Sequence, residues 1–375
     1  MKLRRPSSVA LSWLGEGRRV AAATLVAAEG SSPFEPGATM LVDDQGRIEG
    51  SVTGGCVEGA LFEEASAVLR SEPPRLRTYG ISDSDAAGVG LMCGGTVHVF
   101  IHELRPESRE AIELAEQAID EGRPAVIATL IDGAAAGTQV ALVDDHLVGS
   151  FGLVGRLDRA VEREARGCVA HAVSALRSYG SEGEVMGTEL RVFLHAFAKP
   201  ASMIIFGAID FSAAVASLGR QLGYEVTICD ARRPFTEATR FAAADHVVVD
   251  WPDRYLADRQ LDTRDVVLVF THDPKFDEPA LISALATNAG YIGALGSRKT
   301  HEDRSRRLIE AGVEEEQLSR IASPCGLDVG ARTPEETAVS ILGEILASAA
   351  GRSGRPLSQT DERIHAPKKV PTTLA

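Results

Sequence analysis

The chain has 375 residues, and its acidic residues outnumber the basic ones to give a formal net charge of -14. This length predicts two domains that bury a substantial core without cross-links. The acidic balance, together with the lack of a long basic run, argues against a surface for nucleic acid or for an anionic membrane.

The cysteines are scattered along the chain, at positions 56, 93, 168, 229 and 325, without the paired spacing of a structural zinc site. We therefore expect reduced thiols. No apolar stretch approaches the ~20 residues of a membrane-spanning helix, and the basic N-terminus leads into no apolar signal region. These features predict a soluble cytoplasmic protein.

The first part of the chain predicts two strands followed by a helix. The strands are expected at 20–28 and 38–43, with a loop Gly30-Ser31-Ser32-Pro33 between them. Apolar residues recur near one face of the segment 57–69, which predicts a helix.

Two cysteine motifs flank this helix, Gly54-Gly55-Cys56-Val57-Glu58 and Cys93-Gly94-Gly95. Each places one thiol beside two glycines, so the backbone can approach a ligand closely and turn its N–H groups toward an anion. Cys56 also precedes the predicted helix, whose N-terminus attracts anions. A binding site is one interpretation. The alternative is that both thiols are small buried groups at tight turns, as free cysteines usually are.

Residues 96–102 alternate as in a strand and place His98 and His102 on one face. A solvated face explains this better than a metal site, because no third donor follows at a ligand spacing.

Residues 106–199 predict a further α/β stretch. We expect a helix near 108–120, a strand near 125–131, a hairpin at Asp144-Asp145 and a helix over 157–179. Lys199-Pro200 marks a domain boundary, because proline ends one strand and an apolar strand begins directly afterwards.

From Ser202 onward the pattern becomes strand, helix, strand with short connections, which predicts a parallel sheet covered by helices. The opening is a strand at 203–207, a helix at 211–222 and a strand at 224–230, the order of a Rossmann-type fold. Thr333-Pro334-Glu335-Glu336 predicts the start of the last helix.

The dinucleotide fingerprint of such folds is incomplete here. Gly207 matches its first glycine, but Ile209 stands where the backbone should meet the pyrophosphate and Ser212 replaces the third glycine. Asp230 ends the second strand, where an acid would bind the ribose hydroxyls of NAD. Arg232 and Arg233, which follow Asp230, would instead favour a phosphate at this position.

Two later strand ends are also candidates, because open parallel sheets bind ligands at the carboxyl ends of their strands. Thr271-His272-Asp273 follows one of these strands. His272 is a candidate general base, and the alternative is a histidine that only packs at the end of the strand. In the segment 291–299, Gly293, Gly296 and Ser297 predict an N–H-rich turn, and Arg298 with Lys299 adds positive charge. A purely structural strand-to-helix turn is the alternative.

Taken together, these motifs resemble the XdhC/CoxI family of accessory factors for xanthine dehydrogenase, carbon monoxide dehydrogenase and related molybdenum hydroxylases. The resemblance is carried by Gly30-Ser31-Ser32-Pro33, Gly37-Ala38-Thr39-Met40, the segment 50–58, Cys93-Gly94-Gly95, Asp230-Ala231-Arg232, Thr271-His272-Asp273, the segment 291–300, and the segment 324–330 followed by Thr333-Pro334-Glu335-Glu336.

The resemblance implies an α/β fold, with an XdhC-type α/β domain followed by a Rossmann-like doubly wound parallel sheet. We expect a cofactor-handling domain at 1–199 that includes a middle subdomain, a Rossmann-like domain at 200–350 and a mobile tail at 351–375. Family members often carry Gly-Ala-Gly after the first Rossmann strand, where this chain has Gly207-Ala208-Ile209.

The function implied by the resemblance is that of a chaperone for the molybdenum cofactor, without turnover of its own. Such a chaperone binds the cofactor, lets a cysteine desulfurase exchange an oxo ligand on molybdenum for sulfide, and delivers it to the apo-hydroxylase. A homodimer is also expected. The alternatives are an NAD(P)-dependent oxidoreductase and a zinc-dependent hydrolase, for which three convergent ligands are lacking.

Cys56 and Cys93 are the candidates to contact the metal or carry sulfur, and no catalytic residue is assigned. The other candidate cofactor contacts are Gly54, Gly55, Gly94, Gly95, Ser31, Ser32 and Thr53 in the first domain, and Gly207, Asp230, Arg232, Gly293, Gly296, Ser297 and Arg298 in the second. Glu58 is expected to be a favourable first-turn charge rather than an acid or base.

Overall fold

The computed structural model describes residues 5–30, 32–80, 95–153, 155–185, 187–236, 239–361 and 364. Contacts among residues divide the chain into two units, one up to Lys199 and the other from Pro200 to Thr360. None of the described helices is long and apolar enough to cross a lipid bilayer. The expected mobile tail at 351–375 lies partly outside the described residues, and its described part includes a short 3-10 turn at Leu357–Gln359.

The first unit holds two antiparallel five-stranded sheets, with strand orders β3-β2-β1-β5-β4 and β8-β7-β6-β10-β9. In chain order its elements are α1 (Pro6–Gly15), β1 (Val20–Glu29), β2 (Thr39–Asp43), β3 (Ile48–Gly50), α2 (Glu58–Leu69), β4 (Arg75–Tyr79), β5 (Thr96–Glu103), α3 (Arg109–Asp120), β6 (Ala125–Leu130), β7 (Gln139–Val143), β8 (His146–Val148), α4 (Gly155–His171), β9 (Ala175–Tyr179) and β10 (Leu190–Phe197).

These elements form a tandem structural repeat, in which helix, three strands, helix and two strands occur twice with the same strand order. The register is repeated as well: Leu76 pairs with Phe100 between β4 and β5, and Leu176 pairs with Phe193 between β9 and β10. The middle stretch of the chain is therefore a second copy of the first fold.

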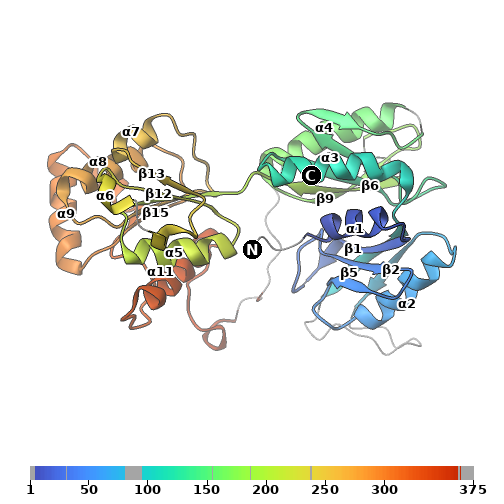
Figure 1. Ribbon diagram of the computed structural model, residues 1–375, viewed down its shortest axis with the longest axis horizontal. Coiled ribbons are helices and arrows are strands. Elements are labelled where there is room, and N and C mark those ends of the chain that lie inside the picture. The colour runs from blue at the N-terminus through green and yellow to red at the C-terminus, as the bar shows by residue number, and fades with distance from the viewer. Residues whose placement is uncertain are drawn as a thin grey trace. The chain divides into compact units, whose positions relative to one another are not determined.

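The two sheets face each other, with α1 and α3 packed between them and α2 and α4 on the outer faces (Figure 1). Beside α1 and α3, side chains of both inner faces meet in one cluster made of Val26, Phe100, Ile131, Ala136 and Phe193. Because Phe100 and Phe193 occupy equivalent positions in their copies, this contact is self-complementary, like the interface of a two-fold dimer.

Two glycine–histidine contacts repeat this symmetry. A Cβ added to Gly37 would clash with the ring of His195 in β10, and one added to Gly137 would lie 3.2 Å from Cβ of His102 in β5. Burial lowers the pKa of both histidines to about 4, so both are neutral at pH 7. His102 therefore packs against the other copy, and does not form a solvated face with His98.

Most of the elements predicted for this unit are present, and one prediction is wrong at its end. The helix expected over 157–179 stops at His171 because Ala172 adopts a positive φ of 54°, and residues 175–179 instead form β9 against β10. The hairpin at Asp144-Asp145 is confirmed, with positive φ at both aspartates between β7 and β8.

The second unit is a six-stranded parallel sheet of order β13-β12-β11-β14-β15-β16. Its elements are β11 (Ser202–Phe206), α5 (Asp210–Gln221), β12 (Glu225–Cys229), α6 (Arg233–Thr236), β13 (His246–Val248), α7 (Pro252–Ala257), β14 (Val266–Val269), α8 (Pro274–Leu285), β15 (Tyr291–Ala294), α9 (Arg298–Glu310), α10 (Glu315–Leu318), β16 (Ile321–Ala322) and α11 (Pro334–Ala349).

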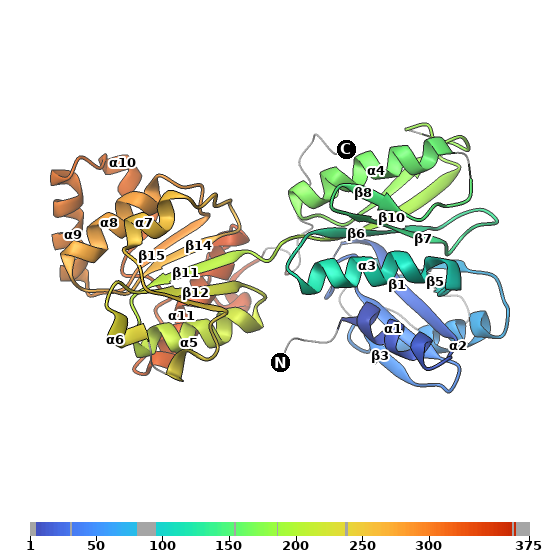
Figure 2. The same ribbon diagram turned by 45° about the horizontal axis from the view of Figure 1, so that its top comes forward.

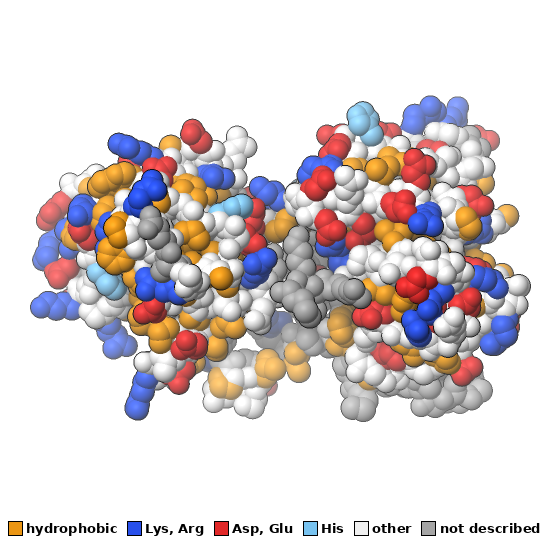
Figure 3. All heavy atoms as spheres, in the orientation of Figure 1, with side chains coloured by type: hydrophobic (Ala, Val, Ile, Leu, Met, Phe, Trp, Pro, Cys, Tyr) orange, Lys and Arg blue, Asp and Glu red, His pale blue; other side chains and the backbone are white. Residues whose placement is uncertain are grey.

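Helices cover both faces of this sheet, with α5 and α11 on one side and α7, α8 and α9 on the other (Figure 2). The order corresponds to 3-2-1-4-5-6 in chain sequence, so the predicted Rossmann-like doubly wound sheet is confirmed. The chain reverses its winding between β11 and β14, and the segments that follow these two strands therefore lie side by side. Acidic and basic side chains are interspersed on the face shown in Figure 3.

We predict that Gly37→Ala lowers the free energy of unfolding by roughly 2–5 kcal/mol, because left-handed backbone costs a non-glycine residue about 1–2 kcal/mol and the clash with His195 adds about 1–3. The matched control is Gly17→Ala, where φ is also positive but a Cβ would meet nothing within 4 Å. Urea unfolding of both variants measures the difference. Equal losses would show that the contact between the copies is not tight.

Candidate functional site

The loop that carries Cys56 connects β3 to α2 and takes its shape from two glycines. Gly54 and Gly55 have positive φ values of 80° and 126°, a conformation that other residues rarely adopt. Cys56 comes two residues before the start of α2 at Glu58, as the sequence predicts, and its side chain is half-buried against the core below α2.

The carboxylate of Glu58 folds back and holds this loop. Its Oε1 accepts hydrogen bonds from Ser51 Oγ at 2.6 Å and from the backbone N–H groups of Thr53 at 2.8 Å and Gly54 at 3.0 Å. Its Oε2 accepts from Thr53 Oγ1 at 2.9 Å and from Gly55 N–H at 2.8 Å. A side chain of the protein itself therefore occupies the anion position that the two glycines create.

This arrangement differs from the expectation that the glycine N–H groups face an external anion. It also gives Glu58 more than the role of a first-turn charge. Burial opposes its ionisation, but hydrogen bonds from Ser51 and Thr53 outweigh burial and lower the pKa of Glu58 to about 2. The spacing of Ser51 and Glu58 is the signal in the sequence that could have revealed this contact.

The exposed side of the loop is open and partly apolar. A Cβ added to Gly55 would meet nothing within 4 Å, and one added to Gly54 would lie 3.5 Å from the ring of Phe34. Phe34 is 40% exposed and follows the Gly30-Ser31-Ser32-Pro33 segment. The structure thus places the residue that follows the Gly30-Ser31-Ser32-Pro33 segment beside a glycine of the Cys56 loop.

The hydroxyl candidates in this region have internal partners. Ser32 Oγ donates to the carbonyl of Phe34 at 2.8 Å, and Thr53 is buried with its hydroxyl on Glu58. Gly95 is buried just before β5. Ser31, Cys93 and Gly94 lie outside the described residues, so their proposed contacts with the cofactor stay predictions.

The other described thiols differ from Cys56 in being fully enclosed. Burial raises the pKa of Cys168 to about 11 and those of Cys229 and Cys325 to about 12. Such thiols are inert toward metals and electrophiles at neutral pH. Among the described residues there is also no group of three or more His, Cys, Asp or Glu side chains placed to hold a metal ion.

The second copy of the fold contains the equivalent loop without a thiol. Ser150 Oγ donates to Asp158 in α4 at 2.7 Å, and the N–H of Phe151 donates to the same carboxylate at 3.2 Å. These bonds match those that Ser51 and Val52 make to Glu58. Arg156, which is exposed, precedes the buried Leu157 just as Cys56 precedes the buried Val57.

In the second unit, the carboxyl end of β11 is packed tightly. Gly207 has a φ of 110°, and a Cβ there would lie 3.1 Å from backbone and side-chain atoms of Thr271 after β14. A glycine is therefore needed at position 207, because the ends of β11 and β14 leave no room for a side chain. Ser212 is buried and donates from its hydroxyl to the Gly207 carbonyl.

Asp230 is buried after β12 and uses its carboxylate within the protein. One oxygen accepts from the Ala208 N–H at 2.9 Å and from Arg232 Nη2 at 2.8 Å, and the other accepts from Arg232 N and Nε, each at 2.9 Å. Burial raises the pKa of Asp230, but these bonds outweigh it and lower the pKa overall. Little acceptor capacity is left for ribose hydroxyls.

The candidates after β15 divide into packing and surface residues. Gly293 is buried inside β15, where a Cβ would lie 2.7 Å from the ring of Tyr291. Ser297 caps α9 by accepting from the Thr300 N–H at 3.1 Å. Gly296 precedes it, and Arg298 is exposed in the first turn of α9.

Sequence reasoning missed a buried ion pair that joins these strand ends. Arg304 of α9 is 1% exposed and donates to Asp277 of α8 at 3.1 Å, to the Leu295 carbonyl at 3.0 Å and to Ser323 Oγ at 3.1 Å. Asp277 also accepts from Thr271. The network fixes the positions of the segments that follow β14, β15 and β16.

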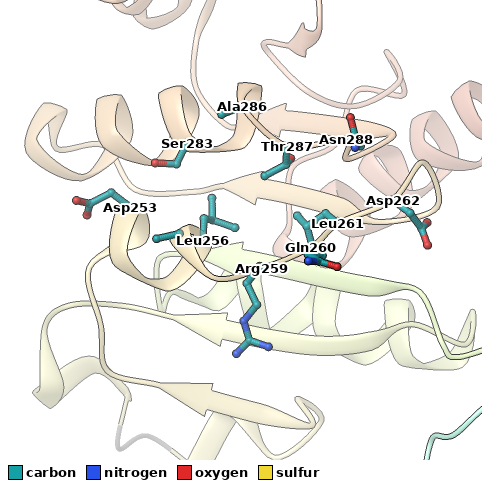
Figure 4. Close-up of a pocket in the computed structure, with 11 residues that line it drawn as sticks. Asp253, Leu256, Arg259, Gln260, Leu261, Asp262, Ser283, Ala286, Thr287 and Asn288 are labelled. Carbon is teal, nitrogen blue, oxygen red and sulfur yellow. The ribbon is translucent and has the colours of Figure 1, made fainter.

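A hollow of about 720 Å³ lies elsewhere in this unit, between α7, the C-terminal end of α8 and residues 258–262 (Figure 4). Its lining includes Asp253, Arg259 and Asn288. These segments precede β14 and β15, so the hollow lies at the amino-terminal ends of the strands. It contains none of the predicted site residues.

Two stretches of the chain match known protein families. Residues 13–80 match the model of the XdhC and CoxI family, and residues 203–345 match the XdhC Rossmann domain. The chain belongs to the XdhC and CoxI family. The Cys56 loop lies within the first match, and Gly207, Asp230 and the Arg304 network lie within the second.

Two curated relatives in this family align with most of the chain. A protein from Bacillus subtilis, named as a probable subunit of xanthine dehydrogenase, is 27% identical over 326 residues, which are 86% of this chain and 91% of the relative. The "Molybdenum cofactor insertion chaperone PaoD" of Escherichia coli is 27% identical over 336 residues, 90% of this chain and 85% of the relative.

A crystal structure described as a xanthine dehydrogenase from Bacillus halodurans has the same fold. It superposes with a TM-score of 0.68 at 24% identity and covers 95% of this chain and 98% of its own. Both units of this XdhC-family chain therefore have a counterpart of known structure.

We predict that Glu58→Gln destabilises the first unit, by about 1–3 kcal/mol at neutral pH, because one of the two accepting oxygens becomes an NH2 group, which cannot accept the bonds from Ser51, Thr53 and the loop N–H groups, and because the negative charge is lost. Since the folded pKa of about 2 lies below the unfolded value of 4.5, the contribution of Glu58 is complete above pH 4.5 and is lost as the pH falls toward 2.

Denaturant unfolding of wild type and Glu58→Gln from pH 7 down to 3 measures this contribution, and the difference between them should shrink with pH. Asp158→Asn in the second copy is the matched control for loop destabilisation. A gap that stays constant down to pH 3 would contradict the role given to the ionised carboxylate.

Proposed function

We propose that this protein is a maturation factor for molybdenum hydroxylases that binds the molybdenum cofactor at the Cys56 loop. Membership of the XdhC and CoxI family supports this, as does the name of the Escherichia coli relative, a molybdenum cofactor insertion chaperone. The observation that carries the proposal is a half-buried thiol on an open loop that Glu58 holds in one conformation.

The residues around Cys56 fit the metal end of such a cofactor. The thiol is a soft donor, and the space beside Gly55 is open for a ligand to approach. The phosphate of the cofactor would not bind the N–H groups of Gly54 and Gly55, because Glu58 already accepts from both. When bound, the cofactor would supply the molybdenum centre, while Glu58 would keep the loop ordered with and without it.

In this proposal a cysteine desulfurase acts on the bound cofactor, and an apo-hydroxylase of the xanthine or carbon monoxide dehydrogenase type receives it. Cys93 is proposed as the second thiol, and a homodimer as the working form. The alternative, an NAD(P)-dependent oxidoreductase, is disfavoured because Ile209 stands at the pyrophosphate position and Asp230 has its oxygens engaged.

We predict that Cys56→Ser reduces retention of molybdenum and pterin by at least about tenfold, the loss that even an outer-sphere change produces at metal sites. The measurement is molybdenum and pterin content after anaerobic incubation with released cofactor and removal of unbound ligand. Cys168→Ala, which removes a buried thiol from the same unit, should retain the cofactor.

Unchanged retention by Cys56→Ser would contradict the role of the thiol. No retention by the wild type would contradict the proposed function as a whole. A rise in melting temperature with NAD(P) at millimolar concentration would instead favour the oxidoreductase alternative, since a ligand that binds only the folded state stabilises it.

A further inference from the structure

Aromatic and cationic side chains gather in the second unit where β12, β13 and β14 end. The guanidinium carbon of Arg232 lies 4.2 Å from the ring centroid of Phe235 and 5.6 Å from that of Phe276. Trp251 packs on Phe276 with ring centroids 5.0 Å apart, and Lys275 Nζ lies 4.8 Å from the Phe276 centroid. These five residues, here named the Arg232 cluster, come from the segments that follow β12, β13 and β14.

Two rings of the cluster are left on the surface. Phe276 is 5% exposed and forms the floor, whereas Phe235 is 43% and Trp251 39% exposed. The chain thus presents two exposed aromatic rings, Phe235 against Arg232 and Trp251 against Phe276, at the edge where open parallel sheets bind their ligands. Planar heterocycles bind to such surfaces, because they stack on exposed aromatic rings and on the guanidinium group.

The cation is held in a fixed orientation. Asp230 accepts hydrogen bonds from Nε and Nη2 of Arg232, and no described residue accepts one from its Nη1. Arg233 is exposed in the first turn of α6 and forms no ion pair with any residue that the structure describes. Lys275 is paired with Asp273 at 3.0 Å. Arg232 therefore offers its remaining N–H donors, and Arg233 offers positive charge, to an anionic group beside the rings.

We propose that the Arg232 cluster binds a planar nitrogen heterocycle that carries a phosphate, with the ring stacked on Phe235 or Trp251 and the phosphate at Arg232 and Arg233. This differs from the usual dinucleotide pose, which needs a glycine at 209 and a free carboxylate at 230. The proposal goes beyond the Cys56 site and does not depend on it. A nucleoside phosphate and a pterin phosphate share this chemistry.

The test uses Trp251 as the reporter. The chain has two tryptophans, and Trp13→Phe leaves Trp251 as the only one. In this background, titration with GMP should quench the fluorescence with saturation, and equilibrium dialysis with a pterin monophosphate tests the second source. Saturable binding of either ligand supports the site and identifies which heterocycle it prefers.

Phe235→Ala should weaken binding at least about fivefold, the effect of losing about 1 kcal/mol of ring stacking. Phe235 is exposed on a four-residue helix, so its removal leaves the core intact. Ile309→Ala, which trims an exposed residue of α9, is the control for a surface change and should leave the affinity unchanged.

The proposal is overturned if neither ligand binds at millimolar concentration, or if Phe235→Ala and Trp251→Leu, the second measured by equilibrium dialysis because it lacks the reporter, both bind as tightly as the parent protein. Cys56→Ser should bind GMP like the parent. Loss of cofactor retention at Cys56 and loss of heterocycle binding at the Arg232 cluster are therefore separate results, and each can fail without the other.

Discussion

The carboxylate of Glu58 is the interaction on which the candidate site depends. A loop with two left-handed glycines has converging N–H groups that need an acceptor, and Glu58 provides one from the first turn of α2. The cost of desolvation is outweighed by hydrogen bonds from Ser51 and Thr53. These bonds lower the pKa of Glu58 to about 2, so the carboxylate stays ionised at any higher pH. The loop is therefore ordered before any ligand arrives, and Cys56 is presented from a fixed backbone.

The tandem repeat of the first unit shows which contacts of the Cys56 loop are common to both copies of the fold. Ser150 and Asp158 repeat the contact of Ser51 and Glu58, so the acid that holds the loop belongs to the fold itself. The glycine pair and the thiol belong to the first copy, because Arg156 follows the second loop where Cys56 follows the first. Within the described residues the thiol site therefore occurs once per chain, although the scaffold that supports it occurs twice.

The second unit keeps the Rossmann topology and changes its usual ligand contacts. Asp230 binds Ala208 and Arg232 instead of remaining free, and Gly207 is needed where β11 and β14 end side by side. The buried pair of Arg304 and Asp277 ties the following strand ends together. Because Arg232 is held by Asp230, its guanidinium becomes part of a surface with Phe235 and Trp251, and this surface is the basis of the heterocycle site proposed above.

The sequence by itself determined the fold class, the doubly wound order of the second half, most helices and strands, and the position of Cys56 before α2, because these depend on local periodicity, turns and caps. Tertiary structure decided the rest. The repeat was hidden because equivalent contacts, such as Leu76 with Phe100 and Leu176 with Phe193, join residues far apart in sequence. The loop N–H groups and Asp230 needed the structure for another reason. The glycines and the acids were visible and close in the sequence, but only the folded backbone shows that each N–H group and each carboxylate oxygen already has an internal partner.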